Sequence, residues 1–82
     1  MRIDAFLKQS TLLKRRTLAK GYCDNGLVFV NDKQVKPSSE VKDGDIIKVH
    51  LGNRIVIAKA IIKVTPKREF GSYELIEVIS QK

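Results

Sequence analysis

The densest cluster of chemically active side chains is a basic run near the amino end, Lys14-Arg15-Arg16, followed by Thr17 and Lys20. On a helix, Arg16 and Lys20 are four residues apart and share a face, while Lys14 and Arg15 lie at the start of the same element. Like charges this close repel each other, and bound phosphates would turn that repulsion into binding. Arginine contacts a phosphate through two hydrogen bonds, and lysine acts as a point charge. The run predicts a phosphate-binding surface; the alternative is a solvated helix face.

The charge balance of the whole chain supports an anionic partner. The 82 residues carry 16 Lys and Arg against nine Asp and Glu, which gives a formal charge of +7. Residues 1–20 alone hold six basic groups and one acid. A basic excess of this size in a small domain favours nucleic acid as the partner.

Length and composition exclude several classes of protein. A chain of 82 residues forms one domain and is too short for most deep-cleft enzymes. Its apolar runs are too short to span a bilayer, and Arg2 and Asp4 interrupt any signal-peptide pattern. The single cysteine, Cys23, excludes an internal disulfide and a cysteine-based zinc site. We therefore expect a protein of the reducing cytoplasm, with no membrane partner.

Other residues that could do chemistry have structural explanations. Cys23 lies on the apolar side of the expected second helix, where a small buried side chain suffices. His50 has no partner at metal-ligand spacing and is expected to face solvent from a strand. Asp43 and Asp45 flank Gly44, and a turn explains both carboxylates.

Two helices are expected to position the basic run. Ile3, Phe6 and Leu7 have the spacing of a helical apolar face. Ser10 and Thr11 break this pattern and can cap a second helix from about residue 12 or 13 to 25. The apolar face of the second helix would contain Leu18, Ala19, Tyr22 and Cys23, and Gly26 would end it.

After Gly26 the apolar pattern becomes strand-like. Strands are expected at 27–30, 33–35, 46–51, 54–64 and 73–79, with a helix left open as the alternative for 58–62. Turns at Asn31-Asp32, Asp43-Gly44-Asp45 and Gly52-Asn53, and loops at 36–39 and 65–71, would connect them. Two helices followed by about five short strands predict an α+β fold.

Five separated motifs occur in the order and spacing of one known family. They are Arg2-Ile3-Asp4, the segment from Lys14 to Lys20, the segment from Asn25 to Asn31, Lys36-Pro37-Ser38-Ser39, and the segment from Val41 to Ile47. In this pattern the chain resembles the S4 RNA-binding domain, and at this size the RqcP group within it, which is related to the S4-type ribosome-associated heat-shock proteins. The resemblance covers residues 1–50 and implies an S4-type αL motif, in which two amino-terminal helices pack on a small, mostly antiparallel sheet. Residues 51–82 would be a β extension of the same single domain.

The resemblance also implies a function without catalysis and without a cofactor. Proteins of the RqcP group act in ribosome-associated quality control. They bind rRNA of a large ribosomal subunit that is obstructed by peptidyl-tRNA. There they stabilise the tRNA while an elongation factor of the RqcH type adds a tail, typically of alanine. The sequence does not fix the oligomeric state, and a monomer is the simplest interpretation.

By the same resemblance, Arg16 is the strongest predicted RNA contact, Arg2 matches the arginine that opens the domain, and Asp4 orients or caps. The full predicted RNA-binding set is Arg2, Lys8, Lys14, Arg15, Arg16, Thr17, Lys20, Lys33, Lys36 and Ser38. Pro37 belongs to the same loop as Lys36 and Ser38. The chain departs from the family pattern at Arg15, where many members have Ser, and at Asp32, where the hairpin usually has Gly.

Three alternative functions share these sequence features. The chain could be a heat-shock-type factor that recycles stalled large subunits. It could be the RNA-targeting part of an RNA-modifying enzyme, although 82 residues leave no room for a catalytic domain. It could also be a protein–protein adaptor with an incidental basic face. A second basic cluster, Lys63, Lys67 and Arg68, either contacts RNA or is a solvated loop.

Overall fold

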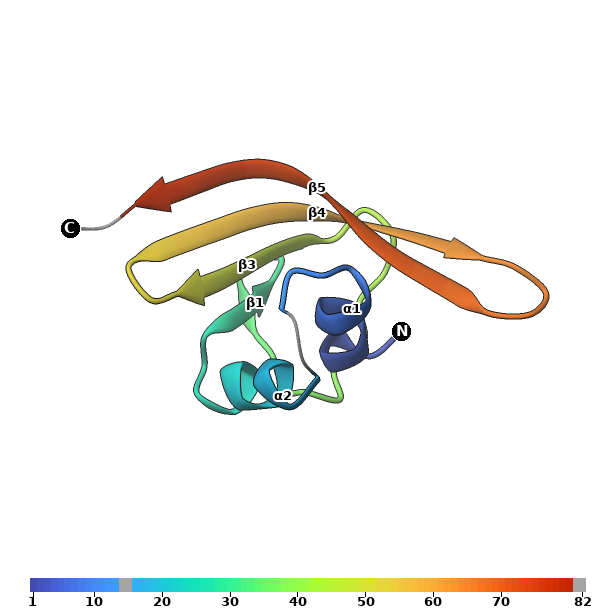
Figure 1. Cartoon of the computed structure of the whole chain (residues 1–82), viewed down its shortest axis with the longest axis horizontal. Helices are drawn as coiled ribbons and strands as arrows, with labels where there is room; N and C mark the ends of the chain where they lie inside the picture. The colour runs from blue at the N-terminus through green and yellow to red at the C-terminus, as the bar shows by residue number, and fades with distance from the viewer. Residues whose placement is uncertain (14–15, 81–82) are drawn as a thin grey trace.

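Two short helices lie against one face of a five-stranded antiparallel sheet (Figure 1). The computed structural model describes residues 1–13 and 16–80, without the side chain of Arg16. Helices α1 (Ile3–Gln9) and α2 (Arg16–Asp24) precede all the strands. The strands are β1 (Val28–Val30), β2 (Lys33–Gln34), β3 (Ile46–Leu51), β4 (Arg54–Val64) and β5 (Glu69–Ser80). Their order in the sheet is β2-β1-β3-β4-β5, which confirms the expected α+β fold.

The core forms between the helices and one face of the sheet. Partners in an antiparallel pair share a face, so the pairs Val28–Val49, Val30–Ile47 and Ile47–Ala58 place these buried side chains on the helix side. The helices contribute Ile3, Phe6, Leu7, Ala19 and Cys23, all buried in the same cluster. Burial of these side chains is the main force that holds the short helices in place.

The two helices depart from the sequence prediction at their junction. Ser10 ends α1 as its C-cap, and its hydroxyl donates to the Leu7 carbonyl at 3.3 Å. Thr11 follows in the left-handed region (φ 68°), so the predicted cap of the second helix is wrong. Leu13 lies before α2 yet is buried in the core, and the described helix begins at Arg16. Leu18, predicted to be buried, is 46% exposed.

The helix-to-sheet junction was predicted correctly at Gly26. This residue has φ 72° and follows the last turn of α2, which ends at Asp24. A Cβ atom here would lie 1.9 Å from the Gln34 side-chain nitrogen, but that exposed side chain is flexible and can move aside, so the positive φ is what favours glycine.

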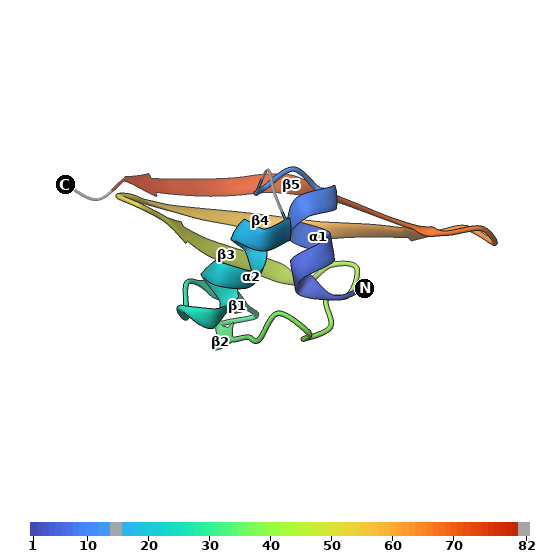
Figure 2. The same cartoon turned by 60° about the horizontal axis from the view of Figure 1, so that its bottom comes forward.

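The β4–β5 hairpin is longer than predicted. Residues 58–62 are strand, so the helix alternative is wrong, and β5 begins at Glu69 instead of Tyr73. All eleven residues of β4 pair with β5, and Ile76 is left unpaired at a bulge opposite Ile57 and Ala58. The hairpin extends past the helices and widens the molecule to 45 Å in its longest dimension (Figures 1 and 2). Within residues 1–13 and 16–80, no helix is long and apolar enough to cross a bilayer.

Candidate nucleic-acid interface

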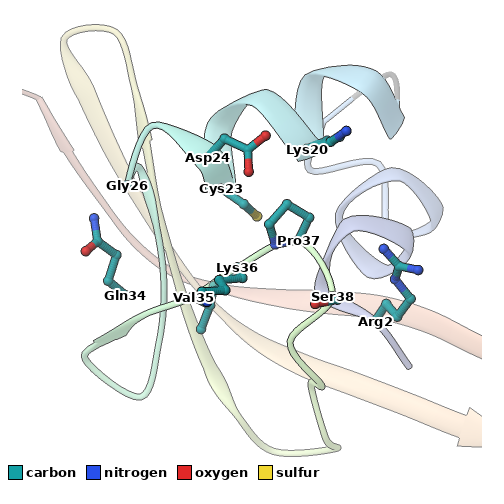
Figure 3. Close-up of a pocket in the computed structure, with 10 residues that line it drawn as sticks. All are labelled: Arg2, Lys20, Cys23, Asp24, Gly26, Gln34, Val35, Lys36, Pro37 and Ser38. Carbon is teal, nitrogen blue, oxygen red and sulfur yellow. The ribbon is translucent and has the colours of Figure 1, made fainter.

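An open groove of about 600 Å³ lies where the start of α1, the end of α2, β2 and the following loop meet (Figure 3). Each of these elements contributes side chains, and three of the lining residues are basic. The lining residues are Arg2, Lys20, Cys23, Asp24, Gly26, Gln34, Val35, Lys36, Pro37 and Ser38. We call this feature the basic groove.

Backbone hydrogen bonds hold two walls of the basic groove together. The amide of Ile3 donates to the Ser39 carbonyl at 2.8 Å, and that of Asp4 to the Pro37 carbonyl at 3.3 Å. The Val41 amide donates to the Met1 carbonyl at 2.9 Å. The first amides of a helix lack partners within it, and here the carbonyls of the loop satisfy two of them. Arg2 and Ser38 are therefore held beside each other by atoms of the main chain.

A buried carboxylate orients Arg2. Asp4 is 4% exposed, and its Oδ2 accepts a hydrogen bond from the Arg2 guanidinium at 3.2 Å. Its Oδ1 accepts from the Ala5 amide at 2.7 Å. The Arg2 side chain remains 55% exposed and lines the groove, so its other N–H groups are available to a ligand. Asp4 thus has the orienting role that the resemblance implied.

Cys23, which lines the groove, is not a reactive thiol. Burial, together with the negative charges of Asp4 and Asp24, raises the pKa of the Cys23 thiol to about 11. The thiol is therefore protonated at neutral pH, whereas a nucleophile would need the thiolate. Cys23 packs in the core cluster, as the sequence predicted.

The structure gathers only part of the predicted RNA-binding set. Arg2, Lys20, Lys36 and Ser38 line the basic groove, together with Pro37 of the same loop. Thr17 and Lys8 are exposed on the helices but do not line it. Lys14, Arg15 and the side chain of Arg16 lie outside the described residues.

Lys33 lies outside the basic groove. It lines a separate, smaller depression, which also contains Lys42, Glu40 and Asp45. Lys33 and Gln34 are neighbours on β2, and successive strand side chains point to opposite faces, so Gln34 lines the groove and Lys33 does not. Asp32 is exposed and lies 3.8 Å from Lys48, so its carboxylate is not one of the groove-lining groups.

Sequence reasoning missed two polar residues of the groove, Asp24 and Gln34. Asp24 reduces the positive charge at the rim, and Gln34 reaches the site because β2 returns past Gly26. The only sequence signal for Gln34 was its place two residues after the Asn31-Asp32 turn. A turn at that place predicts that Gln34 pairs with Phe29, but it does not predict that the Gln34 side chain lies beside Gly26 at the end of α2.

The other candidate residues have structural roles. Asp45 accepts from the Lys42 amide at 2.9 Å within the turn, as predicted. Asp43 instead accepts from the Ile62 amide of β4 at 2.8 Å, a contact between distant segments that the turn alone does not explain. His50 is half-buried beside the Phe29 ring, at 5.6 Å between centroids, so the prediction of a solvent-facing histidine is wrong. In the described part of the chain, no three His, Cys, Asp or Glu residues group as a metal site would require.

Comparisons with known proteins agree with this geometry. A family model described as "S4 domain" matches residues 1–47. The "RQC P-site tRNA stabilizing factor" of Bacillus subtilis is 47% identical over 70 residues, which cover 84% of this chain and 81% of that protein. The Streptococcus pneumoniae protein of the same name is 38% identical over 79 residues, which cover 93% and 90%. The solved structure of Vibrio cholerae Heat Shock Protein 15 matches with a TM-score of 0.72 at 23% identity, covering 90% of this chain and 81% of that one.

Proposed function

Because the chain belongs to the S4 domain family and to the RQC P-site tRNA stabilizing factors within it, we propose that it stabilises peptidyl-tRNA on obstructed large ribosomal subunits. It does so by binding RNA in the basic groove during ribosome-associated quality control. The convergence of Arg2, Lys20 and Lys36 from three separate elements of the fold carries the proposal.

The groove binds the phosphodiester backbone. Arg2 offers a planar fork already oriented by Asp4, so it loses little freedom when it meets a phosphate. Lys20 and Lys36 add point charges, and the Ser38 hydroxyl can donate to a phosphate oxygen. Structured RNA is recognised largely by shape and backbone contacts, which suits an open basic groove better than a closed pocket.

The protein acts by holding RNA, without a covalent step. A factor that binds only the tRNA-loaded subunit stabilises that state by a free energy that grows with the logarithm of its concentration over its Kd. The tRNA then remains in place while a tailing factor of the RqcH type works. We propose that the chain does this as a cytoplasmic monomer, and that Arg16, Lys14 and Arg15 also contact the RNA.

Co-sedimentation with purified large subunits tests this function. The full chain is titrated against empty subunits and against subunits that carry peptidyl-tRNA, over a range of salt concentrations. We expect tighter binding to the loaded subunits and a steep loss of affinity with salt, since released counterions drive such binding. Equal binding to both kinds of subunit would indicate a general ribosome-associated factor. Absence of binding would favour the protein–protein adaptor.

Two double variants make the test specific. Lys20→Gln/Lys36→Gln removes two groove charges, and Lys42→Gln/Lys59→Gln removes two exposed charges outside the groove. We expect the groove variant to bind loaded subunits about tenfold more weakly and the salt slope to fall by about 1–2, because each lost phosphate contact removes about 0.9. The control variant should stay within about twofold of the original protein. Arg16→Ala tests the predicted contact that lies outside the described side chains.

A further inference from the structure

A second basic feature lies at the far end of the β4–β5 hairpin, beyond the helices (Figures 1 and 2). Its turn, residues 65–68, joins the last residues of β4 to the first of β5. Lys63, Lys67 and Arg68 lie within six residues of each other here. We call residues 63–70 the hairpin tip. None of the three basic side chains is within ion-pair distance of a carboxylate among the described residues.

The turn of the hairpin tip is closed by hydrogen bonds. The Thr65 amide and the Thr65 hydroxyl both donate to the Arg68 carbonyl, each at 2.9 Å. The Arg68 amide donates back to the Thr65 hydroxyl at 3.2 Å. These bonds hold Thr65 and Arg68 together, so the backbone that carries Lys67 and Arg68 has a defined conformation.

An aromatic ring organises the charges at the hairpin tip. The Arg68 guanidinium lies over the Phe70 ring, 4.4 Å from its centroid. Phe70 pairs with Lys63 across the hairpin, so Lys63 shares its face of the sheet. The ring is 40% exposed, although an aromatic side chain normally gains from burial. A guanidinium stacked on a ring keeps its N–H edges available for a phosphate.

The base of the hairpin is fixed against α1, so the direction of the tip is set. A Cβ atom on Gly71 would lie 2.9 Å from the Phe6 ring, which leaves space for glycine only. The Gly71 amide also donates to the Gln9 side chain. Glu69, the acid nearest to the three cations in sequence, lies 3.6 Å from the amino group of Met1. That contact weakens the one negative charge that would oppose an anion.

We propose that the hairpin tip is a second RNA-binding site, which holds the phosphodiester backbone of an RNA segment separate from the one in the basic groove. The inference rests on the proposed function and adds a site to it. Three cations without an ion-pair partner among the described residues, two of them beside the exposed Phe70 ring, suit consecutive phosphates. An acidic protein segment is the competing ligand. The hairpin tip projects past the helices that form the groove (Figures 1 and 2), so the two sites can contact separate stretches of RNA. Binding at both sites would make the affinity exceed that of either site alone.

A charge-removal experiment tests the site. Lys67→Gln/Arg68→Gln is compared with Lys42→Gln/Arg54→Gln, which removes one lysine and one arginine outside both sites. Each full-length variant is titrated against large subunits that carry peptidyl-tRNA. We expect the tip variant to bind about 5- to 10-fold more weakly with a salt slope lower by about 1–2, and the control to change less than twofold. Equal effects of the two variants, or no effect of either, would overturn the second site.

A cleavage experiment identifies the ligand at the tip. Lys67→Cys is labelled with an iron chelate that produces hydroxyl radicals, and Lys42→Cys serves as the matched position. The native Cys23 is buried with a raised pKa, so the added thiol reacts selectively. RNA strand breaks from position 67 that exceed those from position 42 are expected. If radicals from position 67 cut only ribosomal protein, the tip binds an acidic protein surface and the inference is wrong.

The two proposals fail in different ways. If the unmodified chain does not bind loaded large subunits, the proposed function fails and the tip site fails with it. If the chain binds and Lys20→Gln/Lys36→Gln weakens it while Lys67→Gln/Arg68→Gln does not, only the tip site is wrong.

Discussion

The basic groove and the hairpin tip carry similar charges but are positioned by different kinds of structure. In the groove, hydrogen bonds join residues nearly forty positions apart, such as Ile3 with Ser39 and Met1 with Val41. At the hairpin tip, the bonds join neighbours in sequence, Thr65 and Arg68. The groove therefore depends on contacts between distant parts of the chain. The hairpin tip depends on a local turn, in a hairpin that packs against α1.

Burial shows the same contrast. Phe6, Ile47 and Val49, with other side chains below 2% exposure, support the elements that form the groove. In β5, Gly71 is the one buried residue among those described, and Leu75 and Ile76 are more than half exposed. Substitution of the buried residues that position the groove should therefore lower the free energy of unfolding. Substitution of exposed residues at the hairpin tip should lower only the affinity for RNA. Four predictions test this comparison, in order of decreasing effect.

Phe6→Ala should have the largest effect. The ring is fully buried between α1 and the sheet, so its removal leaves a cavity and costs about 3–5 kcal/mol. A domain of this size has a total stability of about 4–12 kcal/mol, so a large fraction would unfold. Urea denaturation measures the loss. A cost below 1 kcal/mol would mean that the core does not support the groove as described.

Gly71→Val should come next, because it acts where the two regions touch. The added side chain would meet the Phe6 ring and the Met1 sulfur, and overpacking of this kind costs about 1–3 kcal/mol. The hairpin must then move away from α1. Thermal unfolding gives the cost, and Ser72→Val, at the exposed neighbouring position, is the control. Equal stability of both variants would show that the hairpin base is not fixed.

Raising the pH should destabilise the region around Cys23. Its pKa is about 11 in the folded chain against 9.0 in the unfolded one, so the folded state holds the proton more tightly. The stability from this group is complete below pH 9 and is lost as the pH rises toward 11. Between pH 8 and 10 we expect a loss of about 1 kcal/mol. Cys23→Ala should remove that part of the pH dependence, measured by denaturation at each pH; an unchanged profile would contradict the assignment.

Ile76→Ala should have the smallest effect. The side chain is 53% exposed and unpaired at the bulge of β5, so its truncation should change the free energy of unfolding by less than about 0.5 kcal/mol. Urea denaturation beside Phe6→Ala gives a direct comparison. A cost above 1 kcal/mol would mean that β5 is covered by another molecule in solution.

Much of the fold could be predicted because it follows from local patterns. The spacing of Ile3, Phe6 and Leu7 predicted α1, and the β-branched runs predicted β1, β3 and β4. Gly26 marked the end of the second helix because few other residues adopt its positive φ. The Asp43-Gly44-Asp45 turn was predicted from composition, and Asp45 accepts a backbone hydrogen bond within it as expected, whereas the bond from Ile62 to Asp43 comes from a distant strand.

The remaining features depend on contacts between distant segments. The start of the second helix was misplaced because Thr11 adopts a left-handed conformation that its residue type does not signal. Leu13 is buried outside a helix, and Leu18 is exposed within one, since the relative placement of α1 and α2 decides which side chains are covered. Four groove residues could be predicted from the family pattern, whereas Asp24 and Gln34 required the observed approach of β2 to α2.

The bonds between residues 1–4 and residues 37–41 have a consequence for the order of synthesis. A helix of seven residues such as α1 is not stable alone in water. Its first amides gain their partners only when Pro37 and Ser39 are available. The part of the chain that is translated first must therefore wait for half of the polypeptide before it can settle. The segments that form the groove are all present once residue 41 has been made, whereas the hairpin must wait for β5 and then closes between residues that are near in sequence.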